Sequence, residues 1–171
     1  ETAATCSTPA TQFAVTINAL PTPSVITGSA SVCTGATASV YSVTNVVGNT
    51  YAWTVVGGSI TAGTGTNSIT VTWGAAGPGT VDVTETETAT TCSAAATQFA
   101  VTINALPTVT WPDVLTNQCV NSTTYTLSGG SPAGGVYSGA GVTGANFNAS
   151  VAGVGAHVLT YTYTDGNSCE N

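Results

Sequence analysis

Apolar and polar residues alternate along several short segments of the chain, which is the pattern of β-strands with one buried face. The alternation is clearest at residues 51–55, 69–73, 81–84 and 98–104. The apolar positions of these segments hold β-branched or aromatic side chains: Tyr51, Trp53 and Val55; Ile69, Val71 and Trp73; Val81 and Val83; Phe99, Val101 and Ile103. No segment of ten residues has a helical period. The pattern predicts an all-β chain.

Glycine-rich segments separate these strands, at residues 47–49, 57–58, 63–67 and 74–79. Glycine and asparagine supply the positive φ values that tight turns require. Strands of five to seven residues with turns at this spacing are typical of a two-sheet β-sandwich. The polar positions of the strands are mostly Thr, a β-branched residue that suits a solvated strand face without adding charge.

A sequence of twelve residues, TQFAVTINALPT, occurs twice without change, at residues 11–22 and 97–108. When the comparison starts at Glu1 and Glu87, nineteen of twenty-two positions are identical. Such similarity indicates recent duplication of one building unit, and hence a tandem array. Both copies run into proline without a Gly/Ser-rich linker, which predicts a stiff joint between successive units.

The repeat also predicts the domain boundaries, because Pro21 and Pro107 open equivalent units. We expect residues 1–20 to be the closing strand of a preceding, truncated repeat. Residues 21–106 should form a complete β-sandwich, and residues 107–171 a second β-sandwich that lacks its last strand.

Five cysteines with no CxxC pair and a single His favour disulfides in an oxidising compartment over a zinc site. Cys33 and Cys119 each follow a unit-opening proline by twelve residues, and Cys92 and Cys169 each fit the position before a closing strand. The repeat therefore predicts the bridges Cys33–Cys92 and Cys119–Cys169, with a partner for Cys6 in a preceding unit. A bridge closing about 60 residues would stabilise by roughly 4 kcal/mol in the chain-entropy model. Small buried thiols are the alternative.

The chain contains no Lys or Arg and seven acidic residues, which gives a net charge of −7. Nucleic-acid binding and contact with an anionic membrane surface both need clustered cations, so the composition argues against both partners. No apolar run approaches the eighteen or so residues of a membrane-spanning helix, and we expect no membrane insertion. The missing Lys also rules out Lys–Asn isopeptide cross-links, which leaves disulfides as the covalent device.

A family resemblance rests on segments from both units. The first unit contains SVCTGATASVYSVTNVVGNTYAWTVVGGSIT from Ser31, then TNSITVTWG and GTVDVTET. These segments resemble the PKD-like or Ig-like repeats of large surface proteins of Bacteroidota. The second unit contains TTYTLSGGSPAGGVYSGAGV and NFNASVAGVGAHVLTYTYTDGNSC, which resemble repeats of gliding and attachment adhesins exported by the type IX secretion system. The resemblance implies tandem Ig-like or PKD-like sandwiches in a rod-like array, located outside the cell or on its surface.

Few residues are candidates for chemistry. Asp82, Glu85 and Glu87 form the densest acidic cluster, where either a weak cation site or ordinary solvated carboxylates are conceivable. A hydrolase triad would need His157 close to an Asp such as Asp165. No GxSxG nucleophile motif or phosphate-binding glycine loop occurs. We therefore expect no catalytic residue, no metal site and no cofactor.

The aromatic residues are candidates for sugar stacking or for core packing. Tyr51, Trp53 and Trp73 lie on the apolar faces of their strands, which favours burial. Trp111 follows the Pro107 joint, where we expect it either to pack between successive domains or to be exposed, and it is the best single candidate for a contact residue.

The expected function is a non-catalytic stalk or filament region of a large extracellular cell-surface adhesin, used for attachment or gliding. Its partners would be neighbouring repeats of the same chain or filament, and surface polysaccharide is a further candidate. One alternative is that these are accessory, carbohydrate-binding or spacer modules of a secreted polysaccharide-active enzyme. Another is a filament subunit that polymerises by donor-strand complementation, since a closing strand stands at residues 11–20 while the second unit lacks one.

Overall fold

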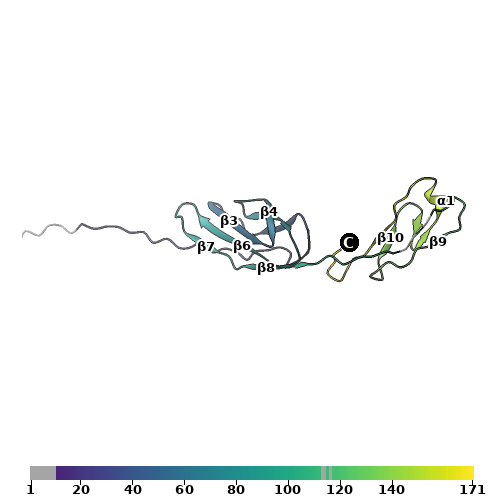
Figure 1. Cartoon of the computed structure of the whole chain (residues 1–171). Coiled ribbons are helices and arrows are strands. Elements are labelled where there is room, and N and C mark those ends of the chain that lie inside the picture. Colours follow the sequence, from purple (N-terminus) through teal and green to yellow (C-terminus); the bar gives the residue numbers. More distant parts are fainter. Residues whose placement is uncertain (1–10, 113–114, 116) are drawn as a thin grey trace, which may run out of the picture.

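The computed structural model describes residues 11–112, 115 and 117–171. Two β-rich regions follow one another along the chain, each with its own cluster of buried side chains (Figure 1). Residues 11–20 are extended and exposed, and they lead away from the first region on the side opposite the second (Figure 1). Residues 1–10 of the expected closing strand lie outside the described part of the chain.

The first region contains a sheet built around the long strand β6. Its strand order is β1 (Ser31–Cys33), β8 (Phe99–Asn104), β6 (Gly77–Glu87) and β3 (Asn49–Val56), and β7 (Ser93–Ala95) also pairs with β6. The first half of β6 pairs antiparallel with β8, from Gly77 opposite Ile103 to Val81 opposite Phe99. On its other side β8 pairs in parallel with β1. The second copy of the repeated sequence therefore forms a strand enclosed between two neighbours.

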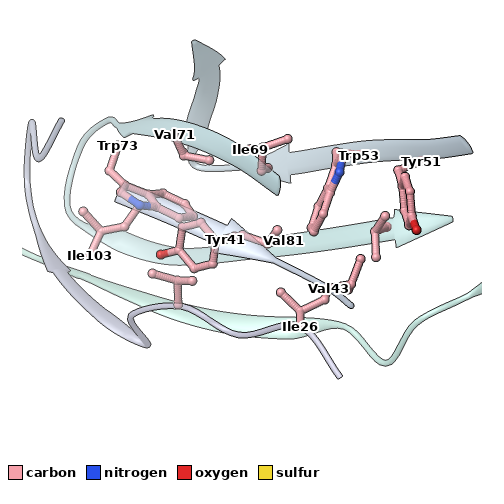
Figure 2. Close-up of a cluster of buried hydrophobic side chains, with 12 residues drawn as sticks. Ile26, Tyr41, Val43, Tyr51, Trp53, Ile69, Val71, Trp73, Val81 and Ile103 are labelled. Carbon is pink, nitrogen blue, oxygen red and sulfur yellow. The ribbon is translucent and has the colours of Figure 1, made fainter. Parts of the chain in front are cut away.

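A second sheet with the order β2 (Ser39–Ser42), β5 (Ser68–Trp73) and β4 (Gly58–Ala62) faces the first. Their apolar faces enclose one core (Figure 2). The buried core residues are Ile26, Tyr41, Val43, Tyr51, Trp53, Ile69, Val71, Trp73, Val81, Val83, Val101 and Ile103. The predicted all-β sandwich is confirmed, and every alternating segment of the sequence forms a strand.

The aromatic side chains that the sequence assigned to the core are buried there. The Tyr41 ring meets the ring of Trp73 edge to face at a centroid distance of 5.8 Å. Trp53 donates its indole N–H to the carbonyl oxygen of Thr66 at 2.8 Å. The Tyr51 hydroxyl accepts a hydrogen bond from the backbone N–H of Val46 at 2.7 Å. Because Tyr51, Trp53 and Trp73 are all buried in the core, their rings are not available for stacking on sugars.

The second region has shorter strands and a smaller core. Its pairings are β10 (Val136–Ser138) with β13 (Thr160–Thr162), and β12 (Asn146–Phe147) with both β9 (Tyr125–Thr126) and β11 (Val142–Thr143). The short helix α1 (Ala149–Ala152) begins after Asn148, whose side chain accepts a hydrogen bond from the backbone N–H of Ser150. Leu127, Phe147 and Ala149 are buried at the centre of this region. The second region is thus β-rich but pairs fewer residues than the first.

Candidate functional site

The joint between the two regions is the best-defined candidate site. It begins at Asn104, the last residue of β8, which lies opposite Cys33 in the register of β1. The Asn104 side chain donates hydrogen bonds to the hydroxyl of Ser31 at 2.8 Å and to the carbonyl oxygen of Val32 at 3.1 Å. The backbone N–H and hydroxyl of Thr34 both donate to the Asn104 carbonyl. The strand that leads into the joint is therefore fixed at its last residue.

A disulfide crosses the joint. It connects Cys33 of the first region with Cys169 of the second, with a Cα–Cα distance of 5.5 Å and a sequence separation of 136 residues. That distance is typical of protein disulfides. Cys169 is fully buried. The two regions are therefore joined by two covalent connections, the backbone after β8 and this bridge.

The end of the chain packs back on the same joint. Tyr163 and Asn171 exchange two backbone hydrogen bonds of 3.0 and 3.1 Å, and the Asn171 side chain donates to the carbonyl oxygen of Pro107 at 2.9 Å. The Asp165 carboxylate accepts from the backbone N–H groups of Asn167 and Cys169 at 2.8 and 2.9 Å. These contacts hold the Cys169 loop beside the first region (Figure 1).

The predicted bridge between Cys33 and Cys92 is wrong, because the two residues lie at opposite ends of the first sheet. Cys33 lies beside the start of β6, whereas Cys92 follows its end and accepts a backbone hydrogen bond from Glu87. The ten residue steps from Gly77 to Glu87 span about 33 Å in a strand. Disulfides need Cα atoms within about 7 Å.

The predicted bridge between Cys119 and Cys169 is wrong for the same kind of reason. Cys119 lies at the α1 end of the second region together with His157. From His157 the chain passes through β13 to Thr164, which pairs with Glu170 next to Cys169. Seven extended residues span about 23 Å. Cys92 and Cys119 are free thiols, Cys119 is exposed, and Cys6 lies outside the described residues.

A groove with a volume of about 670 Å³ opens at the α1 end of the second region. Residues 117–120 and 153–157 form two of its walls, and Phe147 and Ala149 also line it. A smaller cavity of about 240 Å³ shares Phe147 and His157 with it and is lined further by Trp111 and Leu159. We call the larger space the α1 groove. The helix α1, whose Ala149 and Ala152 line the groove, lies at the end of the second region that points away from the joint (Figure 1).

Trp111 is held inside the second region. Its indole N–H donates to the carbonyl oxygen of Ser128 at 2.9 Å, and its ring lies against Tyr137 at a centroid distance of 5.2 Å. Part of the ring remains accessible and faces the smaller cavity. Its role as a contact residue stays a prediction.

The acidic cluster is divided by the fold. Glu85 is buried, with 2% of its surface exposed, and accepts a hydrogen bond from the Asn49 side chain at 2.7 Å. Asp82 accepts from the Gln98 amide at 3.0 and 3.1 Å, and Glu87 accepts from the Thr90 hydroxyl at 2.7 Å. The expectation of solvated carboxylates is therefore wrong for Glu85. No group of three or more His, Cys, Asp or Glu side chains in residues 11–112, 115 and 117–171 is placed to hold a metal.

The only histidine is not paired with Asp165. The exposed His157 ring contacts the carbonyl oxygen of Gly153 at 3.0 Å through Nε2, beside the α1 groove. The Asp165 carboxylate lies at the joint, at the other end of the region, where it accepts hydrogen bonds from the backbone N–H groups of Asn167 and Cys169. The fold therefore separates the two side chains that a hydrolase triad would need together.

In the part of the chain that the structure describes, no helix has the length and apolar character needed to cross a membrane.

Comparison with known families supports the sandwich. Residues 19–103 match the family model of a PKD-like domain, a range that includes both sheets of the first region up to Ile103. No curated protein matches the sequence. PKD-like domains are typically non-catalytic extracellular modules with structural or binding roles, and a disulfide fits an extracellular location. This chain thus carries a PKD-like domain, followed by a second β-rich region that is bridged to it.

Proposed function

We propose that this chain is a non-catalytic structural repeat region, a stalk or filament segment, of a large extracellular cell-surface adhesin. The observation that carries the proposal is the Cys33–Cys169 disulfide across the joint. A bridge within one domain would stabilise that domain alone. A bridge between successive domains also limits their bending and separation, which is a property that a stalk requires.

The bridge also determines how the chain would respond to tension. A pulling force applied to the two termini passes from Cys33 to Cys169 through the disulfide, so the residues between them carry no load along the backbone. Every strand from β2 to β13 lies in this protected segment. Unfolding of either region then adds no length to the chain between the points of attachment, so its end-to-end distance under force does not increase.

The surface chemistry supports an extracellular structural role. The chain has a net charge of −7 and no Lys or Arg, so it offers no site to proteases that cleave after basic residues. The resemblance of both units to repeats of Bacteroidota surface proteins supports attachment or gliding as the setting and the type IX system as the export route.

The experiment that tests this function is to determine the native polypeptide that contains these residues, by intact mass and by sequencing its flanks. We expect further copies of the repeat on both sides, and release of the repeat region when intact cells are treated with an external protease. A polysaccharide-hydrolase domain directly beside these repeats would instead assign them as spacers of a secreted enzyme.

A filament of separate copies is a second candidate, favoured by one observation. Residues 11–20 are extended and exposed, although the same sequence at residues 97–106 contains strand β8 (Phe99–Asn104) inside the first sandwich. An unpaired strand with an apolar face is a ready partner for an open sheet edge.

A further inference from the structure

The disulfide across the joint pairs two cysteines that hold different places in their units. Cys33 is the last residue of β1 and lies opposite Asn104, at the end of the first region from which the chain leaves. Cys169 lies in the loop after β13 that packs back on the joint. The bridge therefore connects the first strand of one unit with a late loop of the next unit.

Cys119 holds in the second unit the place that Cys33 holds in the first. Each cysteine follows a unit-opening proline by twelve residues. The Cys33 carbonyl accepts a hydrogen bond from the backbone N–H of Ala36 at 3.0 Å, and the Cys119 carbonyl accepts one from that of Ser122 at 2.8 Å. Both cysteines therefore begin the same kind of tight turn.

Cys92 holds in the first unit the place that Cys169 holds in the second. The residue before each cysteine has a positive φ, 58° at Thr91 and 63° at Ser168, an uncommon value outside glycine. Each cysteine carbonyl also accepts a hydrogen bond from a backbone N–H earlier in its loop, at 3.0 and 2.9 Å. Cys92 is therefore the counterpart of Cys169, in a loop that is one residue longer.

The two free thiols lie at the outer ends of the two regions. β7 begins directly after Cys92 and lies at the end of the first region from which residues 11–20 extend (Figure 1). Cys119 lines the α1 groove together with Ala149 of the helix α1, which lies at the end of the second region that points away from the joint (Figure 1). In an array, these are the ends that meet the preceding and the following unit.

We propose that Cys92 and Cys119 form the same interdomain bridge with the two neighbouring units of the array. Cys92 pairs with the counterpart of Cys33 in the preceding unit, and Cys119 pairs with the counterpart of Cys169 in the following unit. The Cys33–Cys169 bridge points to these partners, because it shows which two cysteines the fold brings together across a joint. The proposal rests on the structural function above, since it needs further repeats on both sides.

No pairing between the described cysteines competes with these bridges. Cys92 follows the end of β6, and the ten residue steps of that strand alone span about 33 Å in the direction of the joint. Cys119 lies beyond the joint, at the far end of the second region. Because disulfides need Cα atoms within about 7 Å, the partners of these two cysteines come from other units.

Each proposed bridge forms by oxidation of two thiols. The two sulfur atoms form one S–S bond and release two protons and two electrons. A disulfide of a thiol oxidoreductase in the oxidising compartment accepts both and becomes a dithiol. The Cys33–Cys169 bridge requires the same oxidant, so the proposal adds no further reagent.

Overlap of the bridges determines what they do for the array. The segment enclosed by Cys33 and Cys169 contains both Cys92 and Cys119. Two covalent paths therefore run side by side along the array. One passes through the observed bridge, and the other follows the backbone from Cys92 to Cys119 between the two proposed bridges. A single cleavage of the backbone interrupts at most one of these paths, so the array stays covalently continuous.

Peptide mapping of the native polypeptide without reduction tests the proposal. Free thiols are alkylated first, and the chain is then cleaved after aromatic residues. Such cleavage places Cys92 in residues 74–99 and Cys119 in residues 100–125, because Trp111 precedes a proline and is not a cleavage site. We expect each of these two peptides to be linked to a peptide from an adjacent repeat and to be released on reduction.

The outcomes separate this proposal from the structural function. Alkylated Cys92 or Cys119 in a polypeptide whose flanks contain further repeats would overturn the proposed bridges and leave the structural function standing. A link from either cysteine to its own unit would do the same. Flanks without repeats would contradict the structural function, and the proposed partners with it.

Cleavage at a joint provides a second measurement. A site for a sequence-specific protease is inserted between Leu20 and Pro21 of the native polypeptide, and in a control variant between Leu106 and Pro107, where the preceding sequence is identical. The observed bridge spans the control site. We expect both cut proteins to separate only on reduction, and Cys92→Ser to let the first one separate without it. Separation of the first protein without reduction while Cys92 is present, with the control still intact, would overturn the proposal.

Discussion

Breaking the Cys33–Cys169 bridge should change how far the chain extends under force. The bridge encloses 136 residue steps, and an extended chain spans about 3.3–3.6 Å per residue. With the bridge intact, these residues add nothing to the distance between the termini. In Cys33→Ser, complete unfolding should therefore release about 45–49 nm more contour length than in the oxidised parent.

Single-molecule force spectroscopy with handles on the two termini measures this length directly. Cys119→Ser is the matched control, because Cys119 is an exposed free thiol, and we expect its extension to equal that of the parent. Reduction of the parent should reproduce the Cys33→Ser result. If loss of the bridge instead releases a contour length of only roughly 20 nm, which corresponds to about 59 residues, the bridge joins Cys33 to Cys92 and the reasoning is refuted.

The bridge should also raise the equilibrium stability of the protein. In the chain-entropy model a loop of this length destabilises the unfolded state by about 5 kcal/mol. Because the loop includes both regions, loss of the bridge should let them unfold in separate transitions, whereas the bridged protein should unfold with greater cooperativity. Denaturant unfolding followed by Trp fluorescence distinguishes the two cases.

Three further predictions concern individual side chains. Ile103→Ala should destabilise by about 2–5 kcal/mol and Ile17→Ala by less than about 0.5 kcal/mol in the monomer, although the two residues have identical sequence neighbours; urea unfolding compares them. Asn49→Ala should cost about 1.5–3 kcal/mol, because it removes the hydrogen bond to the buried carboxylate of Glu85, and a preserved midpoint would contradict that role. Burial raises the pKa of Tyr41 above its ordinary value of 10.0. Since the unfolded state then loses its proton first, stability should be complete below pH 10 and fall as the pH rises through the pKa of the folded state. Tyr41→Phe should show a smaller alkaline loss in thermal melts between pH 8 and about pH 11.

The strands could be predicted from the sequence because each has a period of two on one apolar face. Residues 81–87 show where this reasoning has its limit. Val81 and Val83 were assigned to the core by their hydrophobicity, but Glu85 continues the same face and is equally buried. Its burial depends on Asn49, which lies opposite Glu87 across the β3–β6 pair. The sequence pattern shows that Glu85 shares a face with Val81 and Val83, but it does not show that Asn49 on the neighbouring strand provides its hydrogen-bond partner.

The disulfide could not be predicted from the repeat. The repeat gives the order of the cysteines along the chain, but it does not show at which end of the sandwich each cysteine lies. Cys33 was expected to pair within its own unit. Its place depends on the parallel pairing of β1 with β8, a contact between residues about 70 positions apart. That pairing brings Cys33 to the end of the sandwich from which the chain leaves. A parallel pairing has no hairpin signal in the sequence, since its strands are not joined by a short turn.

The central claim is that one disulfide connects successive domains across the joint. Peptide mapping of the unreduced protein by mass spectrometry tests it most directly, using a protease that cleaves after aromatic residues because the chain has no Lys or Arg. The structure predicts a linked peptide pair that contains Cys33 and Cys169 and disappears on reduction. A pair containing Cys33 and Cys92, or a free thiol at Cys169, would contradict the claim.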